Sequence, residues 1–300
     1  MISPYLIDGR RLPDHRMVVR AEGKPINGLP PMSSGIRPVT GQHYFFTRGE
    51  MDAFIAAEPG ASAFFRPCIG ADEFIKGKER FILHLSDVPG EVLEQLPLVQ
   101  ERMRAVSDMR SKSKDAANRQ LATYPTRYGG GSVPTTPFLL IPCVSSERRE
   151  YVPMGFFAPP AMVSDLANVV PNASKALFAM LTSSMHMAWM RLTAGRIKSD
   201  YRYIISTVYN TFPVPPLALK DPTLEALGQA VLDARDDRPL GKQYDPAKMA
   251  PSLRAAHAAV DAYVDSLYVP EGFTCEEDRV IHLLTRYYDL TLPNRRKPSP

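Results

Sequence analysis

The sequence predicts an α+β fold in which a mixed α/β region is followed by a small all-helical domain. Short apolar runs bounded by turn residues alternate with helical patterns as far as residue 215, which is typical of strands and helices that share one domain. Proline supplies 29 of the 300 residues, about twice its usual share, and this favours many short elements. Beyond the prolines at 213–216 the periodicity is purely helical. We therefore expect three regions, 1–46, 47–215 and 216–300.

Residues 1–46 predict an irregular connector, because proline and glycine recur throughout them. The first helix is expected immediately afterwards, since Thr47 and Glu50 have the spacing of a capping box and Pro59 ends the pattern. The apolar run 81–85 predicts a buried strand.

Pro97 opens a second helical pattern. In this pattern Val99, Met103 and Val106 fall on one inward face, and the arginines are expected to face outward. Residues 129–132 predict a flexible loop, because three of them are glycine.

The next region predicts two strands, a helix and a third strand. Two apolar runs, 138–144 and 154–158, predict the first two strands. A single helix is expected from Ser174, its N-cap, to Gly195, which ends it. Residues 201–212 are rich in Tyr, Ile, Val and Thr, and this composition favours a strand.

Three amphipathic helices are predicted after residue 216, and together they form a small bundle or a cap on another domain. The first begins at Asp221, and the third opens with the capping-box spacing of Thr274 and Glu277. Residues 294–300 are expected to be frayed. The inward residues are Leu224, Leu227, Val231 and Leu232, then Leu253, Ala256, Val260, Val264 and Leu267, then Val280, Ile281, Leu284 and Tyr288.

The composition argues against several classes of protein. The longest uncharged stretches are shorter than the roughly 18 residues that a membrane span requires, so no membrane association is expected. The first residues lack the basic head and apolar run of a signal peptide. Cys68, Cys143 and Cys275 lie far apart and predict neither a zinc knuckle nor a disulfide framework. The expected setting is a reducing cytoplasm.

The charges are unevenly distributed along the chain, although the formal net charge is only +4. Residues 102–127 contain seven basic and two acidic side chains, and a second basic group lies between 191 and 202. From Asp221 onward acidic residues outnumber basic ones by 13 to 10. A basic middle followed by an acidic tail fits a polyanion, such as nucleic acid, that binds one part of the chain. A solvated charged face is the alternative interpretation.

The common catalytic motifs are missing from the sequence: it has no glycine-rich nucleotide loop, no H-E-x-x-H and no G-x-S-x-G. His186 is expected to be a core histidine. Asp14, followed by Glu22 and Lys24, matches the P-D…E-x-K pattern of metal-dependent nucleases, which places both carboxylates on neighbouring strands to hold a divalent cation. The surroundings show no clean strand hairpin, and a stand-alone nuclease is therefore kept as the alternative function.

Two polar segments combine serine, arginine and tyrosine. Residues 145–151 follow an apolar run, and residues 195–203 lie between a predicted helix and a predicted strand. Hydroxyls and backbone amides hold phosphates, and arginine forks onto guanine or a phosphate. An ion-paired surface turn has the same composition, so both interpretations stay open.

Seven strings of residues occur in order along nearly the whole chain: ISPYLI at 2–7, PMSSG at 31–35, GADEFI at 70–75, VSSERREYVPMG at 144–155, TSSMHMAWM at 182–190, GRIKSDYRY at 195–203 and VYNTFP at 208–213. No single string is a catalytic signature, but the ordered set is specific. It resembles the C-terminal part of the MmeI-like bifunctional restriction–modification enzymes of type IIL/IIG, namely the target-recognition domain and the small helical domain after it.

The resemblance implies a parent enzyme that methylates adenine N6 with S-adenosylmethionine and carries a Mg²⁺-dependent nuclease, both ahead of the matched region. Residues 1–46 then correspond to a connector from a missing methyltransferase core, 47–215 to the DNA target-recognition domain and 216–300 to the C-terminal helical domain. No position matches the catalytic, metal or cofactor residues of the family, so none is assigned and no cofactor is expected in this chain. The chain resembles a fragment, a split subunit or the product of a late start.

The expected function is sequence-specific recognition of double-stranded DNA for a methyltransferase core, in cis or on a separate chain. The basic segment 102–127 would neutralise phosphates, and the loop 111–136 is the candidate for the major groove. A scaffold that docks on another protein is a third possibility. The candidate DNA-binding residues are Arg110, Lys112, Lys114, Arg119, Arg127, Ser145, Ser146, Arg148, Arg149, Arg196, Lys198, Tyr201 and Arg202.

Overall fold

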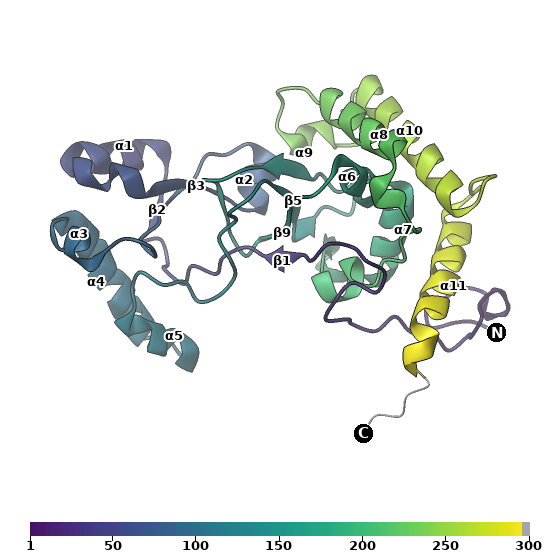
Figure 1. Ribbon diagram of the computed structural model, residues 1–300, viewed down its shortest axis with the longest axis horizontal. Coiled ribbons are helices and arrows are strands. Elements are labelled where there is room, and N and C mark those ends of the chain that lie inside the picture. Colours follow the sequence, from purple (N-terminus) through teal and green to yellow (C-terminus); the bar gives the residue numbers. More distant parts are fainter. Residues whose placement is uncertain (296–300) are drawn as a thin grey trace. The chain divides into compact units, whose positions relative to one another are not determined.

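The structure is a computed structural model that describes the backbone of residues 1–295 and the side chains of residues 1–291. The chain divides into two compact units, each built from separate stretches of sequence. The mixed unit comprises Ser33–Leu140 and Phe156–Val169, and the helical unit comprises Met1–Met32, Ile141–Gly155 and Val170–Pro300. Figure 1 shows the elements of both units, coloured along the sequence. Fraying was predicted for residues 294–300, and of these 296–300 lie outside the described residues.

The mixed unit contains a four-stranded sheet in the order β2-β4-β3-β8. Its strands are β2 (Phe45–Phe46), β4 (Phe81–Leu83), β3 (Phe65–Ile69) and β8 (Met162–Val163). The β3–β8 pair is parallel and the other two pairs are antiparallel. The helices of this unit are α1 (Arg48–Ala57), α2 (Ala71–Lys76), α3 (Gly90–Glu94), α4 (Pro97–Ser111) and α5 (Ala116–Gln120), with the 3-10 turns η2 (Pro59–Phe64) and η3 (Leu121–Thr123).

A second four-stranded sheet has the order β1-β9-β5-β7. Its strands are β1 (Ser33–Ser34), β9 (Ala167–Pro171), β5 (Phe138–Pro142) and β7 (Gly155–Phe157). The strands predicted at 138–144 and 154–158 are therefore present, the first of them divided between β5 and the short β6 (Val144–Ser145). The chain passes from one unit to the other within β5, β7 and β9.

The helices that carry the candidate site begin at identifiable caps. At the start of α1 the Thr47 hydroxyl accepts from the Glu50 amide, and the Glu50 carboxylate accepts from the Thr47 amide at 2.8 Å. This is the predicted capping box, and it is confirmed. At the start of α4 the buried Glu58 carboxylate accepts from the amides of Leu98 and Val99 at 2.9 and 3.0 Å. A residue distant in sequence therefore caps α4 and fixes its N-terminal end.

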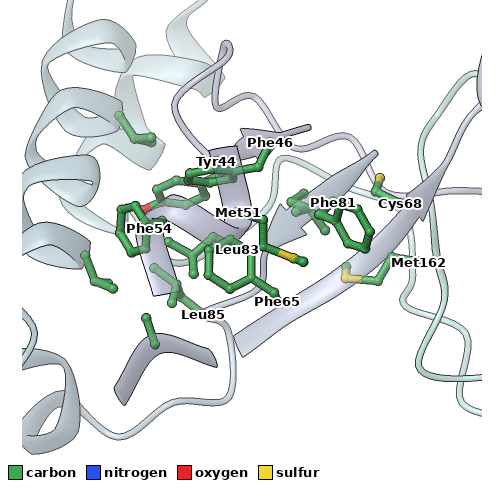
Figure 2. Close-up of a cluster of buried hydrophobic side chains, with 14 of the residues drawn as sticks. Tyr44, Phe46, Met51, Phe54, Phe65, Cys68, Phe81, Leu83, Leu85 and Met162 are labelled. Carbon is green, nitrogen blue, oxygen red and sulfur yellow. The ribbon is translucent and has the colours of Figure 1, made fainter. Parts of the chain in front are cut away.

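The core of the mixed unit is aromatic. Phe46, Phe54 and Phe65 meet edge to face, with ring centroids 5.0 to 5.7 Å apart, and Figure 2 shows them gathered with Tyr44, Met51 and neighbouring side chains. Val99 and Val106 of α4 belong to this cluster, and Met103 packs against it. The inward stripe predicted for α4 is confirmed, and it fixes which face of the helix is exposed.

The helical unit contains a three-stranded sheet in the order β10-β11-β6, with β10 (Gly195–Ile197) and β11 (Asp200–Arg202) joined by a hairpin turn. Its helices are α6 (Lys175–Leu181), α7 (Ser184–Thr193), α8 (Pro222–Asp233), α9 (Leu240–Gln243), α10 (Pro251–Tyr268) and α11 (Glu276–Arg295), with the 3-10 turns η1 (Gly9–Arg11) and η5 (Ala218–Lys220). Helices α8 and α10 lie side by side in Figure 1.

The helices predicted after residue 216 are confirmed as α8, α10 and α11. Asp221 caps α8, because its carboxylate accepts from the amides of Thr223 and Leu224. Gly228 lets α8 approach α6 closely, since a Cβ at this position would lie 2.3 Å from the carbonyl oxygen of Lys175.

The single helix predicted from Ser174 to Gly195 is wrong, because the structure has two helices there, α6 and α7. The Ser183 hydroxyl accepts from the amide of His186 at 3.3 Å and thereby caps a new helix in the middle of the apolar stripe. His186 is fully buried and bonds the Tyr203 hydroxyl at 2.9 Å, as expected of a core histidine.

The strand predicted over 201–212 is wrong beyond Arg202. Ile205–Tyr209 form one turn of π-helix, η4, in which the Asn210 amide donates to the carbonyl of Ile205. A segment near residue 22 of the same chain holds this turn in place. The Glu22 amide donates to the Ser206 carbonyl, and the Asn210 side chain donates to the Glu22 carbonyl. These long-range bonds replace the sheet partner that the β-branched composition favoured.

No helix of the described residues is both long enough and apolar enough to cross a bilayer.

Candidate nucleic-acid interface

Four of the candidate basic residues lie exposed in the mixed unit, between the end of α4 and the segment after η3. We call Lys112, Lys114, Arg119 and Arg127 the 112–127 surface; all four are exposed. Among the described residues none of the four has a carboxylate within 4.0 Å. Their charges are therefore not neutralised by an adjacent acid.

Local hydrogen bonds fold the chain that carries these residues. Asp115 caps the short helix α5 by accepting from the amide of Ala117 at 2.8 Å. The Arg119 guanidinium donates to the carbonyls of Ser113 and Lys114, both at 2.9 Å, and stays exposed. The segment is therefore a defined turn and short helix.

Arg110 departs from the expectation that the arginines of α4 face outward. Its side chain is fully buried, and its guanidinium donates only to backbone carbonyls, those of Pro38, Val39, Leu121, Tyr124 and Arg127. Burial lowers its pKa. The structure therefore places Arg110 inside the fold and not among the exposed cations. The helical period already pointed there, because residue 110 lies four positions after the inward Val106.

Arg37 is an exposed cation of the mixed unit that the sequence analysis did not single out. Its guanidinium donates to the side-chain oxygen of Asn118 in α5 at 3.1 Å. Its backbone pairs with the glycine loop, since Arg37 donates to the Gly130 carbonyl and accepts from the Gly129 amide. Arg37 lies in the region expected to be a connector, and no other Lys or Arg occurs between residues 27 and 47, so no local charge pattern marked it.

A second exposed basic group of the helical unit lies on the β10–β11 hairpin and on the turn after β6. We call Arg148, Arg196, Lys198 and Arg202 the hairpin surface; all four are exposed. Lys198 occupies the two-residue turn between the paired residues Ile197 and Asp200. Its φ of 56° is rare for a residue with a side chain, and it places the lysine at the tip of the hairpin.

Two of the candidate residues, Tyr201 and Ser145, are buried beside the hairpin surface. Arg196, Tyr201 and Ser145 stand opposite one another across the three strands, and the Arg196 guanidinium lies 4.0 Å from the Tyr201 ring centroid. Tyr201 and Ser145 are only 6% and 4% exposed. The Tyr201 ring therefore lies under the arginine and orients its guanidinium, and Ser145 lies across from Tyr201 on the next strand.

The segment after β6 contributes the remaining candidates. The half-buried Arg149 donates to the Ser145 hydroxyl at 3.2 Å, and burial lowers the pKa of its guanidinium. The half-buried Ser146 accepts from the amide of Arg148 at 3.4 Å. Of the predicted polar segment, Arg148 is thus the exposed cation, whereas Arg149 and Ser146 shape the turn that presents it.

Asp14, Glu22 and Lys24, the residues of the nuclease alternative, do not lie on the paired strands that a P-D…E-x-K metal site requires. No strand occurs between Asp14 and Lys24, and the Asp14 carboxylate accepts from the nearby amide of Arg16. Across the described residues no group of three or more His, Cys, Asp and Glu side chains could hold a metal ion. The paired strands that would bring Asp14 and Glu22 together are not found in this segment.

The structure comprises a mixed α/β unit and a helical unit, and each carries exposed cations on short turns. The chain belongs to the MmeI family. The family model described as the MmeI target recognition domain matches residues 13–216, and the one described as the MmeI C-terminal domain matches residues 218–293.

Two relatives extend over almost the whole chain. The protein described as DNA methyltransferase A of Bacillus subtilis (strain 168) is 35% identical over 294 residues, which is 97% of this chain and 33% of that protein. A solved structure of the type IIL restriction–modification enzyme MmeI in complex with DNA matches with a TM-score of 0.90 and 35% identity, over 97% of this chain and 39% of that chain. The chain thus spans about a third of the length of its relatives.

Proposed function

We propose that this chain recognises a specific sequence in duplex DNA as the specificity part of an adenine-N6 DNA methyltransferase and restriction enzyme. The observation that carries the proposal is the match of 97% of the chain to the structure of MmeI in complex with DNA. The matching methyltransferase of Bacillus subtilis supports the same class of reaction for the complete enzyme.

The chemistry of the reaction explains why a recognition part is needed. Adenine N6 is inaccessible inside a stacked duplex, so a methyltransferase extrudes the base before it transfers a methyl group. The flanking duplex has to be held in register while the base is out. In this proposal the methyltransferase core, in cis or on a separate chain, uses S-adenosylmethionine, and the nuclease uses Mg²⁺. This chain contributes the hold on the duplex.

The two exposed basic surfaces suit this task. On the 112–127 surface Lys112, Lys114, Arg119 and Arg127 would neutralise phosphates, together with Arg37 beside them. On the hairpin surface Arg148, Arg196, Lys198 and Arg202 would do the same. Phosphate contacts set affinity and register, whereas contacts with base edges set specificity. Residues 111–136 remain the candidate for the loop that reads the major groove. The proposed regions of the chain are a connector at 1–46, a target-recognition domain at 47–215 and a C-terminal helical domain at 216–300.

The test is selection of bound sequences from a random duplex library with the purified chain. Enrichment of one short sequence, with several-fold tighter binding than a scrambled duplex at the same salt, supports a reader. Equal binding of all sequences contradicts specificity. No binding at low salt favours the scaffold that docks on a protein.

A second arm tests the nuclease alternative on the same duplex. The chain is incubated with DNA and Mg²⁺, and cleavage is followed with the unaltered chain and with Asp14→Ala. Intact DNA in both reactions is expected. Cleavage that Asp14→Ala abolishes would establish the nuclease instead.

A further inference from the structure

Arg110 joins the end of helix α4 to two other segments, 38–39 and 121–127, the second of which begins with the 3-10 turn η3. Its Nε donates to the Val39 carbonyl at 2.9 Å, and its Nη2 donates to those of Pro38 and Arg127 at 3.0 and 2.8 Å. Its Nη1 donates to the Leu121 and Tyr124 carbonyls at 3.1 and 2.9 Å. All the N–H groups of one guanidinium are therefore used, and all of them bind backbone.

The segment 121–127 is held by side chains. The Ser107 hydroxyl donates to the Ala122 carbonyl, the Tyr44 hydroxyl to that of Pro125 at 3.1 Å, and the Ser86 hydroxyl to that of Thr126 at 3.0 Å. With the three bonds from Arg110, side chains bind most carbonyls of the segment: Leu121, Ala122, Tyr124, Pro125, Thr126 and Arg127. Arg110 supplies half of these bonds and is their common centre.

Tyr124 and Arg127 of this segment are exposed, and Arg127 belongs to the 112–127 surface. Tyr124 is 51% exposed, and the Arg127 guanidinium lies 4.6 Å from the centroid of its ring. Stacking on the ring orients the plane of the guanidinium and leaves its N–H edge accessible. A tyrosine hydroxyl and an arginine fork are both common donors to DNA phosphates.

We propose that Arg110 is a positioning residue for DNA binding: it holds the segment 121–127 in the shape that presents Tyr124 and Arg127 to the phosphate backbone, without touching DNA itself. The inference rests on the proposed function. A loop that is ordered before binding avoids the entropy loss of ordering on the ligand, so the loss of Arg110 weakens binding through Tyr124 and Arg127.

The test compares Arg110→Lys with the unaltered chain in binding to a duplex of fixed sequence and in amide hydrogen exchange. Lysine keeps the positive charge but has three donors in place of five, so the change isolates the hydrogen bonds from the charge. Binding is expected to weaken about tenfold. Exchange of the amides of 121–128 is expected to accelerate, while that of α8 stays unchanged.

A double-mutant cycle separates positioning from a general structural effect. In a chain that already carries Tyr124→Ala and Arg127→Ala, Arg110→Lys is expected to weaken binding by about twofold or less, because the groups it positions are gone. Arg235→Lys is the matched control: Arg235 donates to the Met154 carbonyl and the Tyr244 hydroxyl in the helical unit, and its loss should leave DNA affinity and exchange of 121–128 unchanged.

Two results would overturn the inference: unchanged affinity in Arg110→Lys, or an equal loss in the Tyr124→Ala, Arg127→Ala background. If Arg110→Lys does not fold, Ser86→Ala serves as a second variant. Ser86 is exposed and its hydroxyl donates to the Thr126 carbonyl, so the change removes one hydrogen bond that holds the segment 121–127. It should give faster exchange at 121–128 and weaker DNA binding. Unchanged exchange and binding in Ser86→Ala would then count against the inference. Failure of the unaltered chain to bind any duplex refutes the proposed function instead, so the two failures are distinguishable.

Discussion

Replacing Lys112 and Lys114 by alanine should reduce the salt dependence of DNA binding. Both lysines are exposed, and no carboxylate of the described residues pairs with either. Each phosphate contact contributes about 0.9 to the slope of log K against log salt, so loss of two contacts should lower the slope by about 1.8. Between 50 and 200 mM salt each contact accounts for a factor of about 3.5, and the pair for about 12.

The assay is fluorescence anisotropy of a labelled duplex titrated with the chain at several salt concentrations. The matched control is Lys76→Ala with Lys78→Ala, since these lysines have the same spacing in the same unit and lie 2.7 and 3.8 Å from the Asp72 carboxylate. The two double variants carry the same net charge. The control should keep the slope of the unaltered chain. Equal slopes in both double variants would refute the assignment of Lys112 and Lys114 to phosphates.

Three further predictions concern stability, each measured by urea unfolding. Burial lowers the pKa of His186 and of His257 to about 3, so both stay neutral when folded. Between about pH 6 and 4 unfolding should therefore take up two protons, and the free energy of unfolding should fall by about 2.7 kcal/mol for each unit by which the pH is lowered. His186→Gln should halve this contribution to the slope, and a slope equal to that of the unaltered chain would contradict the prediction. Gly131→Ala should cost about 2 kcal/mol or more, because φ is 77° and the new Cβ would lie 2.2 Å from the Gly35 oxygen; a neutral result would refute this. Asp265→Ala should cost about 3 kcal/mol by leaving the poorly exposed Arg279 without its 2.6 Å partner; a loss below about 1 kcal/mol would show that water replaces the pair.

Local rules predicted those elements whose cause is local. The capping box of Thr47 and Glu50, the inward stripe of α4 and the Asp221 cap are each determined by residues within one or two turns, and each is present. The break at Ser183 was missed because an N-cap serine within an apolar stripe resembles an ordinary helical residue. The π-turn Ile205–Tyr209 was missed because its partners, near residue 22, are distant in sequence.

The candidate surfaces were predicted as segments but not as shapes. The sequence placed Ser145 and Tyr201 in two separate polar segments, and only the pairing of β6 with β11 reveals that they are opposite each other, with Tyr201 beneath Arg196. The charge of Arg110 predicted an exposed side chain, whereas its position in the helical period predicted a buried one. The carbonyls that compensate its burial come from segments up to 72 residues away. Such compensation depends on tertiary contacts, which periodicity does not contain.

We propose that the chain binds duplex DNA through the 112–127 surface and the hairpin surface. Amide hydrogen exchange of the full chain, with and without a saturating duplex, tests it most directly. Slower exchange at 112–127, 144–149 and 195–202 in the complex, with α8 unaffected, is the predicted result. Binding that slows exchange only elsewhere, and leaves all three segments as they are in the free chain, would contradict the claim.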